Sequence, residues 1–205
     1  MKITNVNDFD LWRKQYDDMT TEEHVEYHNL IEKHYPVQSH YTYNNIKDAI
    51  ELSKPKIVLE FGPWKADMAC RALAEYNNIE EWHGIEICKS AIDNTNCNNA
   101  KFKYIFPTEF DWFTKERIIN ADLIVATHFI EHLSNEHFEK LVTYCNGVKT
   151  IYFEAPMSDV SNNWTGYGGT HKLEYGWNKV IELFPNYTLV EKYLGQNQGI
   201  LLSLK

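Results

Sequence analysis

The sequence predicts an α/β domain with a mostly parallel sheet and helices on both of its faces. After Pro55, short apolar runs alternate with helical segments, an order typical of parallel strands joined by right-handed crossovers. The last two apolar runs are joined only by residues 194–199, too few for a crossover helix, so an antiparallel hairpin is expected. A length of 205 residues suffices for one core and is short for two independent domains.

Residues 1–53 are predicted to form a helical segment of the same domain. Apolar residues recur at loosely helical spacing between residues 8 and 34, and Thr20–Glu23 is a good helix start, so two helices are expected. Pro36 ends the second, because proline disfavours the α conformation of the residue before it. A third helix is predicted from about Asn44 to Leu52.

Residues 54–205 are predicted to carry the whole sheet. Strands are expected at 56–61, 82–87, 102–105, 122–126, 150–154, 188–193 and 200–204. Helices are expected at about 65–76, in a segment that ends near Ile92, at 135–144 and at 177–184, with a long loop at 156–175. Such sheets bind ligands beyond the carboxyl ends of their strands, so the segments after the first, second, fourth and fifth strands form the candidate site.

Composition and charge narrow the classes of partner. The formal net charge of −9 repels a phosphate backbone, so nucleic acid is a disfavoured partner. No apolar run approaches the roughly 20 residues that span a bilayer, and the first residues lack a secretory signal, so a soluble cytoplasmic protein is expected. The cysteines form no Cys-x-x-Cys pair and are interpreted as buried reduced thiols.

Two acidic residues stand at the ends of the first two predicted strands. The first strand runs into Glu60-Phe-Gly62-Pro63-Trp64, a turn that feeds a helix whose N-terminal amides suit an anionic group. The second ends in Gly84-Ile-Glu86, with Glu86 lying 26 positions after Glu60. A carboxylate at such a strand end can accept hydrogen bonds from both hydroxyls of a ribose.

The order of these motifs resembles the class I S-adenosylmethionine-dependent methyltransferases. The resemblance rests on the acidic-glycine turn, the second acidic strand end and the later segment Asp122–Leu133, and it covers about Lys54 to Lys205. It implies a Rossmann-like seven-stranded sheet that ends in an antiparallel hairpin, and S-adenosylmethionine as cofactor. It also implies methyl transfer to a small or modest-sized acceptor, with the N-terminal helices folded over the cofactor as a lid.

The resemblance implies cofactor contacts along the same edge of the sheet. The implied positions are Glu60, Gly62 and Pro63 at the methionine end, Glu86 at the ribose, Ile87 and Asp111-Trp112 at the adenine, and Thr127 and His128 near the methyl donor. In the lid, Gln38, His40 and Tyr41 are hypothesised to contact cofactor or substrate; the alternative is that they are surface and lid-packing residues. One departure concerns the turn, which in the family resembles Glu-x-Gly-x-Gly-x-Gly. Trp64 and Ala66 occupy the second and third glycine positions here, and glycine permits a positive φ and close ligand approach.

Three residues are candidates for catalysis. His128 follows the fourth strand, and Glu154 ends the fifth, where a general base would face the substrate. His171 closes a glycine-rich segment suited to a gate, and its ordinary pKa near 6.5 suits proton transfer; a solvated loop histidine is the alternative. Methyl transfer from a sulfonium also proceeds by positioning alone, so a base is not required.

Three other functions compete with the methyltransferase. A module that binds S-adenosylmethionine without catalysis is favoured by Trp64 in the glycine turn. A zinc hydrolase would use the string His128-x-x-Glu131-His132, although such a site needs these residues inside a helix together with a third ligand. A nicotinamide oxidoreductase is disfavoured by the terminal hairpin and by the single glycine of the turn.

Overall fold

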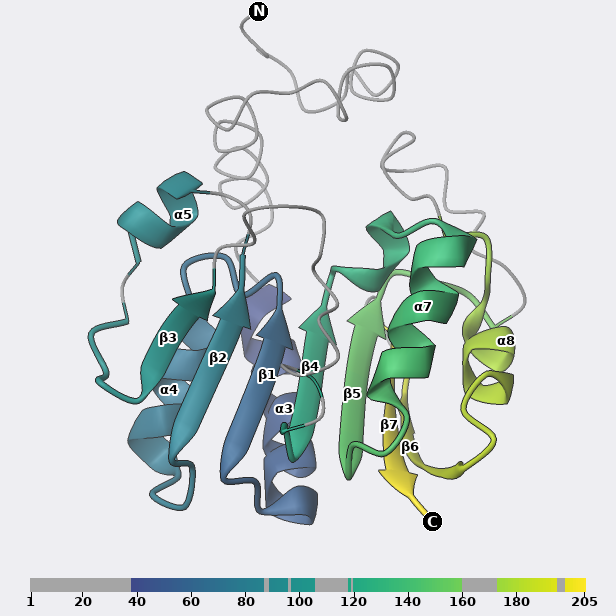
Figure 1. Ribbon diagram of the computed structural model, residues 1–205, viewed down its shortest axis with the longest axis horizontal. Helices are drawn as coiled ribbons and strands as arrows, with labels where there is room; N and C mark the ends of the chain where they lie inside the picture. The colour runs from purple at the N-terminus through teal and green to yellow at the C-terminus, as the bar shows by residue number, and fades with distance from the viewer. Residues whose placement is uncertain are drawn as a thin grey trace, which may run out of the picture.

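The seven predicted strands form one sheet. The computed structural model describes residues 38–86, 89–95, 97–105, 118, 120–159, 173–194 and 198–205. Within these residues the strand order is β3-β2-β1-β4-β5-β7-β6 (Figure 1). The strands are β1 (Ile57–Phe61), β2 (Glu81–Ile85), β3 (Phe102–Ile105), β4 (Leu123–Thr127), β5 (Thr150–Ala155), β6 (Tyr187–Tyr193) and β7 (Gln198–Leu204).

The pairing confirms a mostly parallel sheet with an antiparallel closing hairpin. β1 pairs in parallel with β2 and β4, and the parallel pairing continues to β3 on one side and to β5 on the other. β7 is antiparallel to both β5 and β6. After β1, the chain places β2 and then β3 on one side of it. It then crosses back and places β4 on the other side of β1, followed by β5. The boundary between β1 and β4 is the switch point where α/β sheets of this kind bind ligands.

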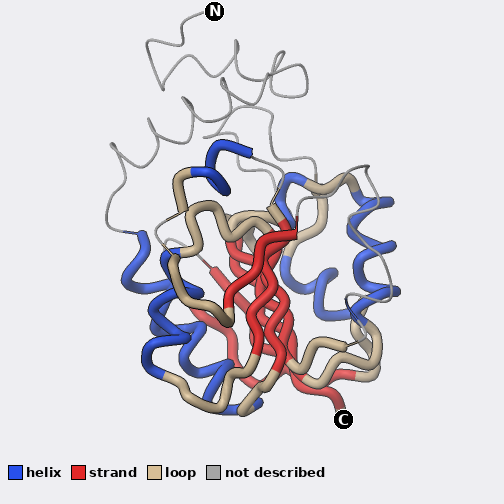
Figure 2. The backbone as a smooth tube through the Cα atoms, turned by 60° about the vertical axis from the view of Figure 1, so that its left-hand side comes forward, coloured by secondary structure: helices blue, strands red, loops and turns tan. Residues whose placement is uncertain are grey.

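Helices cover both faces of the sheet, as the sequence predicts. Figure 2 shows them flanking the strands on either side. They are α3 (Gln38–Ser53) and α4 (Asp67–Glu75) on one face, α7 (Asn135–Cys145) and α8 (Trp177–Glu182) on the other, and the short α5 (Lys89–Asp93) and 3₁₀ helix η2 (Ile130–His132) near the carboxyl ends of the strands. None of the helices in the described part of the chain combines the length and the apolar character needed to cross a membrane.

Two hydrophobic cores lie on opposite faces of the sheet because successive strand residues point to opposite sides. In β1, Val58 packs in the core beneath α3 and α4, whereas Leu59 packs in the core beneath α7 and α8. The α3 side contains Tyr43, whose ring lies 3.9 Å from the guanidinium carbon of Arg71 on α4. Five consecutive residues of β4, 123–127, are buried, as expected of a central strand covered on both faces.

The third predicted helix begins earlier than expected. The prediction placed its start near Asn44, whereas α3 begins at Gln38. Contacts distant in sequence account for the extra turns, because Thr42 and Asn45 both donate hydrogen bonds to Glu154 of β5. Residues with weak helix propensity are then held in the helix by tertiary packing. The two helices predicted between residues 8 and 34 lie outside the described residues.

Candidate functional site

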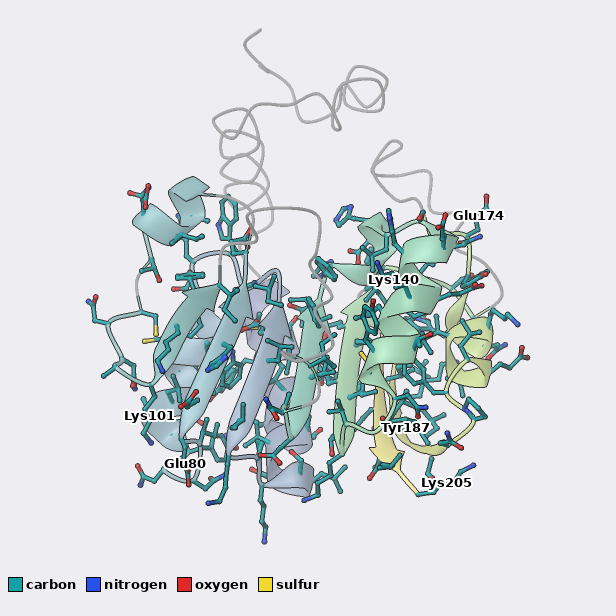
Figure 3. All side chains as sticks on the ribbon, in the orientation of Figure 1. Glu80, Lys101, Lys140, Glu174, Tyr187 and Lys205 are labelled. Atoms are coloured by element: carbon teal, nitrogen blue, oxygen red, sulfur yellow. The ribbon has the colours of Figure 1, made fainter. Side chains whose placement is uncertain are left out.

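The carboxyl ends of β1 to β5 meet at one edge of the sheet, the upper edge in Figure 1. The edge gathers most of the predicted site residues: Glu60, Gly62, Pro63, Glu86, Thr127, His128 and Glu154. The opposite edge carries surface charges instead, including Glu80, Lys101 and Lys205 (Figure 3). The candidate site is therefore assembled by the parallel topology, which turns separate strand ends into neighbours.

The loop between β1 and α4 keeps a glycine-like backbone although it has only one glycine. Gly62, Trp64 and Ala66 have φ values of 68°, 51° and 61°, so all three lie in the left-handed region. These are the three positions at which the family pattern has glycine. Each residue with a Cβ loses roughly 1–2 kcal/mol in this conformation, so the surrounding structure must hold Trp64 and Ala66 in place. The indole of Trp64 is only partly buried.

Close packing fixes where this loop sits. A Cβ at Gly62 would lie 3.4 Å from Cδ2 of Phe129, which follows β4. A Cβ at Gly84 in β2 would lie only 2.6 Å from Cγ of Pro63, so a glycine in β2 is what lets the buried Pro63 rest against the strand. Pro63 is thus fixed by packing against β2.

Glu86 stands at the end of β2, as predicted, and it contacts the loop directly. Its carboxyl is 6% exposed, and Oε2 accepts a hydrogen bond of 3.0 Å from the backbone amide of Trp64. The residue proposed from sequence to hold a ribose therefore also orients the loop that would lie beside that ribose.

Glu60 is a buried acid with one unused oxygen. It is 1% exposed, and Oε2 accepts a hydrogen bond of 2.9 Å from the indole nitrogen of Trp82. Among the described residues, Oε1 has no hydrogen-bond partner. Burial raises the pKa of Glu60 from 4.5 to about 7, against the opposing effect of the Trp82 hydrogen bond and with the negative charge of Glu86 adding to the rise. A buried polar atom without a partner calls for an explanation, and a water or a ligand group that bonds to it is one.

The pH dependence of stability should report this raised pKa. Between pH 4.5 and about 7 the folded protein retains the Glu60 proton and the unfolded chain has lost it, so stability falls as pH rises through that window. The full fall amounts to roughly 3 kcal/mol. We expect Glu60→Gln, which stays neutral, to match the native protein near pH 4.5 and to exceed it in stability at pH 8. Urea unfolding of both proteins across this range tests the difference; parallel curves would contradict it.

At the end of β4 lies His128, in a left-handed conformation with φ 52°. Its backbone amide donates a hydrogen bond of 2.8 Å to the carbonyl of Glu154. Nδ1 lies 3.5 Å from Oε1 of Glu131, and Nε2 lies 4.0 Å from Oε1 of Glu154. Burial by itself lowers the pKa of His128, but the hydrogen bond and negative charge of Glu131, together with the charge of Glu154, raise it above the ordinary value. The two neighbouring carboxylates therefore stabilise the protonated ring, whose N–H groups can donate hydrogen bonds to a ligand.

Glu154 lies beneath α3 rather than facing an open surface. It is 0% exposed, and Oε1 accepts a hydrogen bond of 2.5 Å from the hydroxyl of Thr42. Oε2 accepts hydrogen bonds from the amide of Asn45, at 3.2 Å, and from the hydroxyl of Tyr152. The sequence prediction made Glu154 a general base, and its position at the end of β5 is as expected. Three protein donors, however, favour the role of an anchor that fixes α3 to the sheet.

The zinc-hydrolase pattern does not have the backbone that such a site requires. His128 follows β4 directly, and His132 ends the three-residue 3₁₀ helix η2, so the two histidines do not share one face of an α-helix. Within the described residues, no group of three or more His, Cys, Asp or Glu side chains is arranged to hold a metal ion.

Several predicted site residues lie outside the described part of the chain. These are Ile87, Asp111, Trp112 and His171, together with the side chains of Gln38, His40 and Tyr41 in the first turn of α3. Sequence analysis in turn missed Thr95, Tyr104 and Trp82, whose side chains bond to the loop or to Glu60. No local signal marks these three: the contacts of Trp82 and Tyr104 depend on the pairing of β1, β2 and β3, and Thr95 reaches the loop from the segment between α5 and β3.

Comparison with known proteins gives matches in structure only. No protein-family model matches the sequence, and no curated protein matches it. Among solved structures, an S-adenosylmethionine-dependent methyltransferase from Archaeoglobus fulgidus superposes with a TM-score of 0.63 at 14% identity, covering 86% of this chain and 99% of that one. The chain has the fold of the class I S-adenosylmethionine-dependent methyltransferases.

Other structures with the methyltransferase fold extend this match. An O-methyltransferase family protein from Burkholderia thailandensis gives a TM-score of 0.70 at 5% identity and covers 95% of this chain, which spans 64% of that protein's length. The N-methyltransferase NodS from Bradyrhizobium japonicum, in complex with S-adenosyl-L-homocysteine, gives 0.61 at 13% identity, with 82% and 88% coverage. Since O- and N-methyltransferases both match, the methyltransferase fold leaves the acceptor open.

Proposed function

We propose that this protein is an S-adenosylmethionine-dependent methyltransferase that acts on a small or modest-sized acceptor. The observation that carries the proposal is the loop from Gly62 to Ala66, which keeps three left-handed residues beside the buried carboxylate of Glu86. Trp64 and Ala66 adopt this shape at a conformational cost, which the surrounding contacts must offset.

The residues at this edge fit such a cofactor. Gly62 keeps the loop free of a side chain where β1 ends, and the unpartnered Oε1 of Glu60 lies at the same strand end, suited to a cationic amino group. Glu86 at the end of β2 is suited to ribose hydroxyls. When bound, S-adenosylmethionine supplies a methyl group on a sulfonium. Glu60, Gly62 and Glu86 would hold it, and their acidic character complements its positive charge.

The ends of β4 and β5 would orient the acceptor. Thr127 is 7% exposed at the end of β4, and the adjacent His128 is held by Glu131 and by the backbone of Glu154. Because Glu131 and Glu154 lie beside the ring of His128 and stabilise its protonated form, we assign His128 an orienting role toward the acceptor. Proton removal by His171 stays a prediction from sequence, since that residue lies outside the described part of the chain.

A module that binds the cofactor without catalysis is the second candidate. Trp64 favours it, because an indole at the second glycine position places a large side chain beside the strand ends where the cofactor would bind. Methyl-transfer assays over panels of hydroxyl and amine acceptors separate the two: binding without transfer to any acceptor supports the module.

Titration calorimetry with S-adenosylmethionine and S-adenosylhomocysteine tests the proposal. The native protein is expected to bind both, and Glu86→Ala should weaken binding by about 1.5–3 kcal/mol, the usual contribution of hydrogen bonds to a charged group. Glu80→Ala is the matched control, since Glu80 is exposed at the opposite edge, where its carboxylate pairs with Lys56. Equal affinity in Glu86→Ala and in the control would contradict the assignment of Glu86 to the ribose. Failure of the native protein to bind either compound would contradict the proposed function.

A further inference from the structure

The strained loop between β1 and α4 is held by side chains from outside it. The peptide of Trp64 is bound at both ends: its amide donates to Oε2 of Glu86 at 3.0 Å, and its carbonyl accepts from the hydroxyl of Tyr104 at 2.6 Å. The next carbonyl, that of Lys65, accepts from the hydroxyl of Thr95 at 3.0 Å. These three bonds fix the peptide groups on both sides of Trp64, the left-handed residue at the centre of the loop.

Tyr104 is itself well placed for this contact. It lies in β3, and its ring packs edge-on against Phe102 with centroids 4.7 Å apart, which sets the direction of the hydroxyl. Thr95 lies beside it, with its oxygen 3.3 Å from the Tyr104 hydroxyl, and also accepts from the amide of Cys97 at 3.1 Å. Burial, with the nearby carboxylates of Glu86 and Glu60, raises the pKa of Tyr104 against the opposing effect of Thr95, so the hydroxyl stays a donor.

We propose that Tyr104 is a positioning residue for the cofactor. With Thr95 as its neighbour, it holds Trp64 and Lys65 in the backbone shape that glycines adopt without support. The inference rests on the proposed function, because the shape serves the cofactor. It adds a role for the third strand, which also contacts the site where the carbonyl of Ile105 accepts a hydrogen bond from the amide of Glu86. A glycine at residue 64 accepts a φ of 51° without strain, so the need for Tyr104 should depend on Trp64.

The test measures affinity for S-adenosylhomocysteine in the full chain. Tyr104→Phe removes one hydroxyl and is expected to raise the dissociation constant about fivefold to tenfold, the effect of one lost hydrogen bond. Tyr193→Phe is the matched control, since it removes the hydroxyl that bonds to Asp48 from β6, the outermost strand on the side of the sheet away from β3, and it should leave affinity unchanged. In a Trp64→Gly background, Tyr104→Phe should change affinity less than twofold. Equal losses in the two backgrounds would overturn the proposal.

Amide hydrogen exchange supplies a readout that needs no cofactor. The Trp64 amide should exchange faster in Tyr104→Phe than in the native chain, and Tyr193→Phe should leave it unchanged. Unchanged exchange in Tyr104→Phe would overturn the role of Tyr104, and so would faster exchange with unchanged affinity. Failure of the native chain to bind S-adenosylhomocysteine would instead overturn the proposed function, and this outcome is seen before any variant is made.

Discussion

Gly62→Val is expected to abolish measurable cofactor binding and to lower the free energy of unfolding by about 2–3 kcal/mol. Residue 62 has a φ of 68°, where a β-branched side chain is strongly disfavoured. Its Cβ would lie 3.4 Å from Cδ2 of Phe129, so the added methyl groups have no room on that side. Either the loop shifts or Phe129 moves, and both changes displace the strand ends that form the site. Calorimetry with S-adenosylhomocysteine and urea unfolding measure the two effects.

Gly147→Val is the control that separates the effect of backbone strain from the effect of a changed site geometry. Gly147 has a φ of 106°, and a Cβ there would meet nothing within 4 Å. It precedes β5 and lies away from the carboxyl edge of the sheet. The control should therefore lose stability to backbone strain and keep its affinity for the cofactor. If Gly62→Val binds as tightly as Gly147→Val, the cofactor does not lie against the β1 turn.

Glu154→Ala is expected to lower the free energy of unfolding by roughly 3–5 kcal/mol, because two buried donors and one partly buried donor lose their acceptor. Two of them, Thr42 and Asn45, belong to α3, and the third is the hydroxyl of Tyr152. Nε2 of His128, 4.0 Å from the same carboxyl, also loses a nearby negative charge. Urea unfolding measures the stability, and the pKa of His128, followed by NMR, should fall in this variant.

Glu191→Ala provides the comparison for a glutamate exposed on β6. It should change stability by less than about 0.5 kcal/mol, as surface substitutions usually do. A Glu154→Ala protein of native stability would show that α3 does not depend on this carboxyl. A Glu154→Ala protein that folds and keeps an unchanged His128 pKa would show that the two side chains are not electrostatically linked.

The hydrogen bonds of Glu154 join two parts of the chain that are far apart in sequence. Thr42 precedes it by 112 residues and Asn45 by 109. Through Glu154, whose backbone carbonyl also accepts from the amide of His128, α3 contributes to the shape of the candidate acceptor region. A helix that covers one face of the sheet thus also supports the chemistry proposed at its edge.

Much of the fold is predictable because it depends on local patterns. The short connection at residues 194–199 leaves an antiparallel hairpin as the only compact arrangement, and β6 and β7 pair in that way. The bounds of β3, Phe102–Ile105, agree with the predicted strand. Glu60 and Glu86 lie at one edge because parallel strands share the direction of their carboxyl ends.

Other features depend on neighbours that the sequence pattern does not identify. Propensity predicts glycine for left-handed positions, yet Trp64 and Ala66 adopt them, because strand pairing brings Glu86 and Tyr104 against the loop. Propensity also places the start of α3 near Asn44, whereas hydrogen bonds to a strand more than 100 residues later extend it.

The sequence by itself determined the order of strands and helices, the closing hairpin and the strand ends at which the acidic residues stand. These features follow from apolar periodicity and from the lengths of connections, both of which are local. Only the tertiary structure decided the conformation of the loop after β1, the partners of Glu154 and the surroundings of Glu60. Each of these depends on which side chains meet across the sheet, and that is set by strand pairing and burial rather than by neighbours along the chain.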